Sequence, residues 1–403
     1  MSEEFYRIKR LPPYVIAEVN AMRAAARAAG EDIIDLGMGN PDLPPPQHVI
    51  DKLCEVARKP DAHGYSASKG IPGLRRAQAN YYGRRFGVEV DPETEVVVTM
   101  GSKEGLSSLA TAITAPGDVV LAPNPSYPIH TFGFIIAGAT IRSVPTTPDE
   151  NYWRALDRAM AFTVPKPSIL VVGYPSNPTA EVVDLAFYER LVAWAKENQV
   201  WVLSDLAYSE LYYDGQPTPS ILQVPGAKDV AIEFTSMSKT YSMAGWRMGF
   251  AVGNRKLIAA LTRVKSYLDY GAFTPIQAAA VAAINGPQDI VEANRQLYKK
   301  RRDVLVESFG RAGWEVPPSR ASMFCWAPLP PALAHIGSLE FSKQLLTHAG
   351  VAVAPGVGYG EDGEGFVRIA MVENEHRIRQ AARNVKRYLQ SMGVNVPTQV
   401  KAV

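Results

Sequence analysis

Short apolar runs rich in β-branched residues recur through the middle of the chain, and helix-length stretches separate most of them. The runs are apolar throughout, which is typical of strands buried on both faces of a sheet. This pattern predicts an α/β fold with a mostly parallel seven-stranded sheet and helices on both of its faces. The predicted strands are 95–100, 118–122, 140–144, 168–172, 200–203, 230–235 and 248–252.

The two ends of the chain have a different pattern. A helical stretch at 15–29 stops at Gly30, a residue suited to a helix C-cap, and an apolar strand follows at 33–36. We therefore expect a large domain at 46–285 and a smaller αβ domain built from 1–45 and 286–403. After residue 255 the pattern predicts helices at 255–269, 274–284, 287–312, 339–349 and 373–389, with strands at 323–327 and 366–370.

Composition narrows the class of protein. The 403 residues exceed the size at which one core usually stops growing, and 47% hydrophobic with 20% charged residues is ordinary for a globular protein. Lys and Arg total 42 against 40 for Asp and Glu, so the formal charge is +2, which gives no general reason to expect nucleic acid or an anionic membrane as partner. Because the chain starts with charged residues and has no membrane-length apolar run, we expect a cytoplasmic location.

Several features have ordinary structural explanations. Cys54 and Cys325 are expected to be buried free thiols, because two cysteines make no disulfide framework. The basic run at 299–302 is expected to be the solvated face of a helix, and the glycine-rich stretch 356–365 a flexible loop. The six histidines are scattered without metal-ligand spacing, so no metal site is expected.

The most informative segment is 235–249, which reads TSMSKTYSMAGWRMG. Lys239 follows a predicted buried strand and lies among small hydroxylated and apolar residues. Partial desolvation lowers the pKa of a lysine amine and makes it a nucleophile toward carbonyl groups. Ser236, Ser238 and Arg247 add groups that bind anions, although Ser-x-Ser-Lys alone would also suit a solvated loop.

Polar residues also follow other predicted strands. The strand at 168–172 continues into GYPSNPT, and the strand at 200–203 continues into SDLAY. Binding sites of parallel sheets form at the carboxyl ends of strands, and an aspartate such as Asp205 needs a cationic partner there. The turn MGSK at 100–103 joins a strand to a helix, whose backbone amides and N-terminus can hold a phosphate.

These motifs together resemble the class I aminotransferases of the aspartate aminotransferase superfamily, which have fold type I and depend on pyridoxal phosphate. The resemblance rests on NPT at 177–179, Asp205-x-x-Tyr208, Ser236-x-Ser238-Lys239 and Arg247-x-Gly249, and extends from GNPD at 39–42 to Arg368. It implies a transaminase that moves an amino group between an L-amino acid and a 2-oxo acid, with pyridoxal 5'-phosphate as cofactor.

The resemblance implies roles for the residues nearest the reaction. Lys239 would bond covalently to the cofactor and, once released by the substrate, carry a proton between substrate and cofactor. Asp205 would pair with the pyridine nitrogen and keep it protonated, so that the ring acts as an electron sink. Asn177 and Tyr208 would hydrogen-bond the phenolate oxygen of the cofactor, and Tyr127 would stack on its ring.

It also implies which residues bind the phosphate. Ser102 and Lys103 would do so through backbone amides. The side chains of Ser236, Ser238 and Arg247 would complete the phosphate site, with the guanidinium suited to a bidentate contact.

The substrate site and the quaternary structure follow from the same resemblance. Arg368 would pair with the substrate α-carboxylate, and the Gly39 backbone and Asn177 would complete that site. Tyr65 would reach the phosphate of the neighbouring subunit, which implies a homodimer with shared active sites.

The segments 65–72, 123–130 and 265–271 look most like bacterial alanine aminotransferases. They favour the conversion of alanine and 2-oxoglutarate to pyruvate and glutamate. Aspartate, methionine and LL-diaminopimelate stay open as alternative donors, and a C–S β-lyase is a further reaction on this scaffold. A non-catalytic regulator is disfavoured, because such proteins carry an added DNA-binding domain that we do not expect in this chain.

Overall fold

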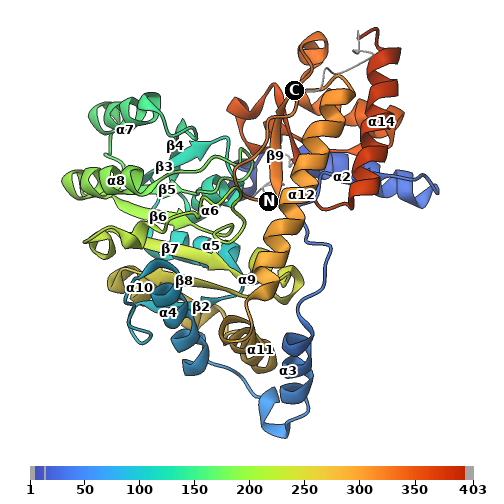
Figure 1. Ribbon diagram of the computed structural model, residues 1–403. Helices are drawn as coiled ribbons and strands as arrows, with labels where there is room; N and C mark the ends of the chain where they lie inside the picture. The colour runs from blue at the N-terminus through green and yellow to red at the C-terminus, as the bar shows by residue number, and fades with distance from the viewer. Residues whose placement is uncertain (1–4, 13–14, 395–403) are drawn as a thin grey trace.

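A seven-stranded sheet forms the centre of the computed structural model, which describes residues 5–12 and 15–394 (Figure 1). The strand order is β2-β8-β7-β6-β5-β3-β4; β8 is antiparallel to both neighbours and all other pairs are parallel. Every predicted strand of this sheet is confirmed to within two residues at each end. The strands are β2 (Val96–Thr99), β3 (Val119–Asn124), β4 (Thr140–Pro145), β5 (Ile169–Val172), β6 (Trp201–Asp205), β7 (Ala231–Ser236) and β8 (Gly249–Gly253).

Helices cover both faces of the sheet, and a separate apolar core lies under each layer. Along β2, Val96 and Val98 belong to one core and Val97 to the other, because successive side chains of a strand point to opposite faces. The predicted mostly parallel sheet with helices on both faces is therefore confirmed. The flanking helices are α3 (Gln47–Ala57), α4 (Pro72–Phe86), α5 (Ser102–Ile113), α6 (Ile129–Ala137), α7 (Glu150–Phe162), α8 (Leu185–Asn198), α10 (Arg255–Leu268) and α11 (Thr274–Asn285).

A second region packs beside the large sheet and combines both ends of the chain. Its strands form an antiparallel sheet in the order β11-β12-β9 and a parallel pair β1-β10. The elements are α2 (Val15–Ala28), β1 (Ile34–Asp35), α12 (Asp289–Arg311), β9 (Phe324–Pro328), α13 (Ser338–Gln344), a π-helical turn (Leu345–Ala349), β10 (Val351–Ala352), β11 (Ala354–Pro355), β12 (Phe366–Ala370) and α14 (Glu375–Ser391). The short helix α1 (Tyr6–Lys9) precedes them, and Arg10 after it donates to the Ala139 carbonyl of the large region at 2.6 Å.

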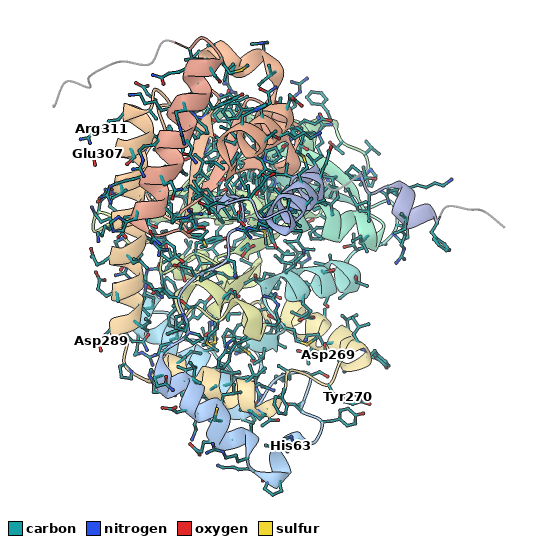
Figure 2. All side chains as sticks on the ribbon, turned by 90° about the vertical axis from the view of Figure 1, so that its right-hand side faces the viewer. His63, Asp269, Tyr270, Asp289, Glu307 and Arg311 are labelled. Carbon is teal, nitrogen blue, oxygen red and sulfur yellow. The ribbon has the colours of Figure 1, made fainter. Side chains whose placement is uncertain are left out.

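The long helix α12 joins the two regions. Val291 near its start packs in a core of the large sheet, whereas Leu305 and Phe309 pack in the core of the second region. Figure 2 shows Asp289 and Arg311 at opposite ends of this helix. We propose that 46–285 form the large domain and that 1–45 with 286–403 form the small one, with α12 as the bridge.

Two expectations about side chains are wrong. Cys54 is exposed on α3, whereas Cys325 is buried in β9 as expected. Arg301 and Arg302 are buried, not solvated, because each reaches a carboxylate on another segment, Asp42 and Asp214 respectively. A basic run on a helix thus turns two of its side chains inward when anions are available there.

Candidate active site

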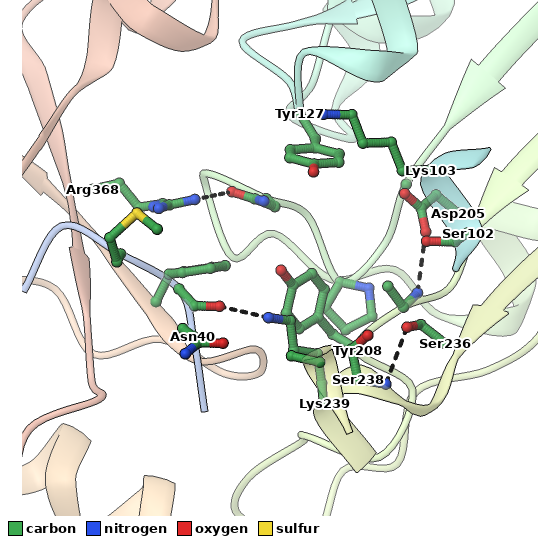
Figure 3. A pocket seen from close by; sticks show the side chains of 18 of the residues that line it. Asn40, Ser102, Lys103, Tyr127, Asp205, Tyr208, Ser236, Ser238, Lys239 and Arg368 are labelled. Carbon is green, nitrogen blue, oxygen red and sulfur yellow. Dashed lines mark hydrogen bonds between the residues drawn. The ribbon is translucent and has the colours of Figure 1, made fainter. Parts of the chain in front are cut away.

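A cavity of about 460 Å³ lies between the large sheet and the second region. Its walls come from the carboxyl ends of β5, β6 and β7, from the start of α5 and from the segment after β1 (Figure 3). Every predicted site residue except Tyr65 lines this cavity. They are Gly39, Ser102, Lys103, Tyr127, Asn177, Asp205, Tyr208, Ser236, Ser238, Lys239, Arg247 and Arg368.

Lys239 projects into the cavity from the single-turn helix α9 (Met237–Thr240), which follows β7 directly. Its Nζ donates a hydrogen bond to the Gly39 carbonyl oxygen at 2.5 Å. Burial, together with the positive charges of Arg368 and Arg247, lowers the pKa of Lys239 from 10.5 to about 8. Much of the amine is therefore unprotonated at mildly alkaline pH and able to act as a nucleophile.

An anion cradle forms where β2 passes into α5. Gly101 has a positive φ of 84°, and a Cβ there would lie 2.2 Å from Nη2 of Arg247, so only glycine fits. A Cβ at Gly249 would lie 2.8 Å from the Ser102 amide nitrogen, so this position also keeps the turn open. The turn, the α5 N-terminus and the Arg247 guanidinium together suit a phosphate.

Two serines on the neighbouring turn extend this cradle. Ser236 caps α9, and its Oγ accepts a hydrogen bond from the Ser238 amide at 3.1 Å (Figure 3). Both hydroxyl groups belong to residues that line the cavity.

Asp205 ends β6, and its partner is a histidine that the sequence reasoning missed. His130 on α6 lies with Nε2 at 2.9 Å from Oδ2 of Asp205, and the Ala207 amide donates to Oδ1 at 3.3 Å. Both Asp205 and His130 are buried. The sequence indicated that a buried aspartate needs a partner, but His130 is 75 positions away from Asp205 and nothing local pointed to it.

Tyr208 and Tyr127 bring phenol groups to the cavity. Tyr208 is buried and packs edge-on against Phe324, with ring centroids 5.6 Å apart. Burial raises the pKa of Tyr208 well above its usual range, so its hydroxyl stays protonated and can donate to an anionic oxygen. The Lys103 ammonium lies 5.8 Å from the centre of the Tyr127 ring.

Arg368 is a buried cation on β12 that makes no ion pair with any carboxylate in the part of the chain that the structure describes. Its Nη1 donates to Asn177 Oδ1 and its Nη2 to the Gly37 carbonyl, both at 2.8 Å (Figure 3). The guanidinium carbon lies 4.0 Å from the centre of the Phe324 ring and 4.9 Å from that of Tyr359. A buried guanidinium held only by neutral groups is prepared for an anionic ligand.

Tyr65 lies apart from the cavity. Its side chain is 89% exposed, and its ring lies 4.6 Å from that of Tyr270. Its expected contact with a neighbouring subunit stays a prediction.

The cavity also contains side chains that the sequence reasoning did not select. Among them are Ile16 and Asn20 of α2, Met38, Phe324 and Tyr359. Phe324 is part of an apolar strand, so its pattern indicated core rather than cavity.

Residues 5–12 and 15–394 lack both a cluster of potential metal ligands and a helix of membrane-spanning character. These residues contain no group of three His, Cys, Asp or Glu side chains placed to hold a metal ion. Within the same ranges, no helix combines the length and the apolar character that membrane crossing requires.

Known proteins with similar sequences and folds identify the family. The model of the family "Aminotransferase class I and II" matches residues 31–385. The chain is 65% identical to a putative aminotransferase, AatC, of Rhizobium meliloti over 96% of each chain. It is 53% identical to the glutamate-pyruvate aminotransferase AlaC of Escherichia coli, over 97% of this chain and 95% of that one. An LL-diaminopimelate aminotransferase of Moorella thermoacetica is 42% identical, over 96% of this chain and 98% of that one.

Solved structures agree with the sequence relatives. Substrate-bound BacF of Bacillus subtilis superposes with a TM-score of 0.89 at 34% identity, with both chains covered completely. A mutant aspartate aminotransferase of Thermus thermophilus superposes with a TM-score of 0.88 at 29% identity, and the superposition covers 96% of this chain and 100% of that one. The chain therefore belongs to the class I and II aminotransferases of fold type I, and it is a transaminase that depends on pyridoxal phosphate.

The side chains in the cavity fit this cofactor. The cradle around Gly101 and Arg247 suits its phosphate, the Lys239 amine suits its aldehyde, and the Asp205 carboxylate suits its pyridine nitrogen. A volume of about 460 Å³ lies within the range of pockets that bind small molecules.

Proposed function

We propose that the chain catalyses glutamate–pyruvate transamination, in which alanine and 2-oxoglutarate give pyruvate and glutamate. The relative that is 53% identical carries this activity in its name, and the resemblance of three segments to alanine aminotransferases points the same way. The observation that carries transamination itself is the juxtaposition in one cavity of a low-pKa lysine and a buried arginine without a carboxylate partner.

The proposed roles follow from the geometry. The Arg368 guanidinium pairs with the α-carboxylate of the substrate, while Asn177 Oδ1 and the Gly37 carbonyl hold that guanidinium in place. Bound pyridoxal phosphate supplies a ring that withdraws the electron pair left at the substrate Cα when a proton departs. The Lys239 amine accepts that proton and returns it, because its lowered pKa lets it exist in both protonation states near working pH.

Two further groups tune the cofactor site. The Asp205 carboxylate, fixed by His130, accepts a hydrogen bond from the pyridine nitrogen of the cofactor. The Tyr208 hydroxyl donates to the cofactor phenolate, since burial keeps this tyrosine protonated. The Gly101 turn, Ser236 and Arg247 bind the phosphate.

The site must accept both alanine, whose side chain is a methyl group, and glutamate, whose side chain ends in a carboxylate. The cations lining the cavity are Lys103, Lys239, Arg247 and Arg368. The last three have the roles proposed above, so we assign the Lys103 ammonium to the distal carboxylate of glutamate and 2-oxoglutarate.

Lys103→Met tests this assignment. We expect the KM for 2-oxoglutarate and glutamate to rise about tenfold, since a charge-assisted contact is lost, with little change for alanine and pyruvate. Equal effects on all four substrates would contradict the assignment.

Steady-state rates with four donors test the function itself. The proposal predicts a higher kcat/KM for alanine than for aspartate, methionine or LL-diaminopimelate, with 2-oxoglutarate as acceptor. LL-diaminopimelate is the second candidate, because relatives 42% and 43% identical carry that activity in their names. A kcat/KM for alanine well below that of another donor rejects the proposal, and release of ammonia and pyruvate from cystathionine would indicate a lyase.

We further propose a homodimer with shared active sites. Tyr65 and the stretch 267–273 present large exposed apolar side chains, among them Tyr267 at 81%, Leu268 at 66% and Tyr270 at 63%. Figure 2 shows Tyr270 projecting from the right-hand side of the lower half of the molecule. Such a cluster is typical of a protein–protein interface. A cytoplasmic location stays a prediction.

A further inference from the structure

The segment between β1 and α3 touches both cations on which the proposed chemistry depends. Its Gly39 carbonyl accepts from Lys239 Nζ at 2.5 Å, and its Gly37 carbonyl accepts from Arg368 Nη2 at 2.8 Å. A Cβ at Gly39 would lie 2.6 Å from the Phe324 ring, so the segment is in close contact with the cavity wall. The position of this segment therefore affects the placement of Lys239 and Arg368.

Only the first part of the segment is held by regular structure. The Leu36 amide donates to Ala352 at 2.9 Å, and the Leu36 carbonyl accepts from Ala370 at 2.7 Å. Among the described residues, no backbone–backbone hydrogen bond involves 37–45, and the next one along the chain is in the first turn of α3, from the Val49 amide to the Pro46 carbonyl. The three prolines at 44–46 have no amide hydrogen to donate. The end of the segment near Asp42 must therefore be fixed by side chains.

One guanidinium supplies that anchor. Nη1 and Nη2 of Arg301 on α12 bind the two carboxylate oxygens of Asp42, each at 2.7 Å. Nη1 also donates to the Met371 carbonyl at 3.2 Å. Met371 directly follows strand β12 and is three residues after Arg368. The Arg301 side chain is only 4% exposed, against 33% for Asp42. Arg301 thus links the segment that carries Gly39 to the strand that carries Arg368.

The next residue on the helix offers a natural comparison. Arg302 is buried to a similar extent and binds two aspartates, with Nη1 at 2.8 Å from Asp214 Oδ2 and Nη2 at 2.7 Å from Asp303 Oδ1. Its Nη1 also donates to the Ser319 carbonyl at 2.9 Å. Neither Arg302 nor Asp214 nor Ser319 lines the cavity. The two arginines therefore share burial and ion pairing, but only Arg301 contacts segments of the substrate site.

We propose that Arg301, acting through Asp42 and the Met371 carbonyl, is a positioning residue that fixes the α-carboxylate site around Gly39 and Arg368. This rests on the proposed role of Arg368 but not on which amino acid is the donor. Every substrate carries an α-carboxylate, so the effect of removing Arg301 is the same for all donors. Small displacements of binding groups are costly even when the mutated residue is remote from the reaction.

The test compares Arg301→Met and Asp42→Asn with Arg302→Met in the holoenzyme. We expect the first two variants to raise the KM for every accepted amino acid by about tenfold and by a similar factor, with a smaller fall in kcat. Arg302→Met should leave KM within twofold of the wild type. The dissociation constant for pyridoxal phosphate, titrated on the apoprotein, should stay within twofold for all three variants, because the phosphate cradle is untouched. Arg301→Lys, which keeps one charge but loses the bidentate fork, should give an intermediate KM.

A KM for Arg302→Met that rises as much as that for Arg301→Met would overturn the proposal, because the effect would then be general destabilisation. So would a fall in kcat alone, or an effect confined to one donor. If Arg301→Met does not fold, Asp42→Asn decides by itself, since it acts at the exposed end of the pair. If the wild type does not accept alanine, the proposed substrate is refuted. The proposal for Arg301 would still hold if the two variants raise the KM by a similar factor for each amino acid that the wild type does accept.

Discussion

At the scale of single residues, the site depends on two cations, the buried Arg368 and the half-buried Lys239, that lack a full complement of anions. Lys239 lies near Arg368 and Arg247, and Arg368 is held by an amide oxygen and a backbone carbonyl. Such an arrangement costs free energy in the empty protein and is relieved by ligands that bring phosphate and carboxylate. This relation between burial and ligand charge makes the residue roles testable.

The lowered pKa of Lys239 predicts an unusual pH dependence in the apoprotein. Burial and the nearby positive charges place this pKa at about 8, whereas the hydrogen bond and charge of Asp303 raise the pKa of Lys299 above its ordinary value. An amine-directed reagent should therefore label Lys239 increasingly as the pH rises through about 8, and Lys299 only at distinctly higher pH. Peptide mass spectrometry of samples labelled at successive pH values measures this. Identical pH profiles for the two lysines would contradict the interpretation.

The sequence predicted the residues of the cavity better than their partners. Lys239, Asp205 and Arg368 were identifiable because their types are unusual beside buried strands. His130 and Asp42 were not, because their partners are 75 and 259 residues away in the chain and nothing local indicates those contacts. The exposure of Cys54 was missed because a cysteine on a helix can lie on either face.

At the scale of elements, each strand of the sheet separates two environments. On β7, Phe234 packs in one core, while the preceding Glu233 is fully buried on the other face. Its carboxylate accepts hydrogen bonds from Tyr82 at 2.9 Å, Ser220 at 2.6 Å and Ser204 at 3.2 Å. No ion pair joins it to a cation within the described part of the chain.

The raised pKa of Glu233 predicts that the contribution of this residue to stability falls as the pH rises. Burial raises the pKa of Glu233 from 4.5 to about 7, against the opposing effect of its hydrogen bonds. The Glu233 carboxyl keeps a proton in the folded apoprotein that it releases in the unfolded chain, so its contribution to the free energy of unfolding falls between about pH 4.5 and pH 7. Relative to Glu233→Gln, the wild type should lose about 3 kcal/mol across this window.

Urea unfolding of both apoproteins at several pH values gives the comparison. Any constant difference from altered hydrogen bonding cancels when only the change with pH is considered. Parallel dependences for wild type and variant would show that Glu233 does not titrate in this window.

Elements were predictable where they are long or strongly apolar. All seven strands of the large sheet follow from the pattern, and so do the helices α2, α10, α11, α12 and α14. Strands β10 and β11 are too short, at two residues each, to leave a periodic signal. The predicted helix at 339–349 is an α-helix only to Gln344 and continues as a π-helical turn, a difference of backbone hydrogen bonding that side-chain periodicity does not encode.

At the scale of the whole molecule, the site depends on segments far apart in the sequence. The cavity combines the turn after β2, the ends of the central strands, the segment after β1 and strand β12. Because α12 packs in both regions and contacts the segment after β1 through Arg301, we expect the relative placement of the regions to affect the geometry of the substrate site.

The proposed shared sites predict complementation between subunits. A dimer that pairs a Lys239→Ala subunit with a Tyr65→Ala subunit contains one site in which both residues are intact. Hybrids isolated through two different tags should therefore have about half the specific activity of the wild type. The two homodimers of the variants should be nearly inactive. Hybrids no more active than their parents would show that Tyr65 acts in its own subunit or not at all.

The covalent attachment of the cofactor tests the central claim most directly. Holoenzyme reduced with borohydride, digested and mapped by mass spectrometry should carry the phosphopyridoxyl group on Lys239, and the Lys239→Ala protein should carry none. Modification of a different lysine with Lys239 unmodified, or no modification after addition of pyridoxal phosphate, would contradict the account.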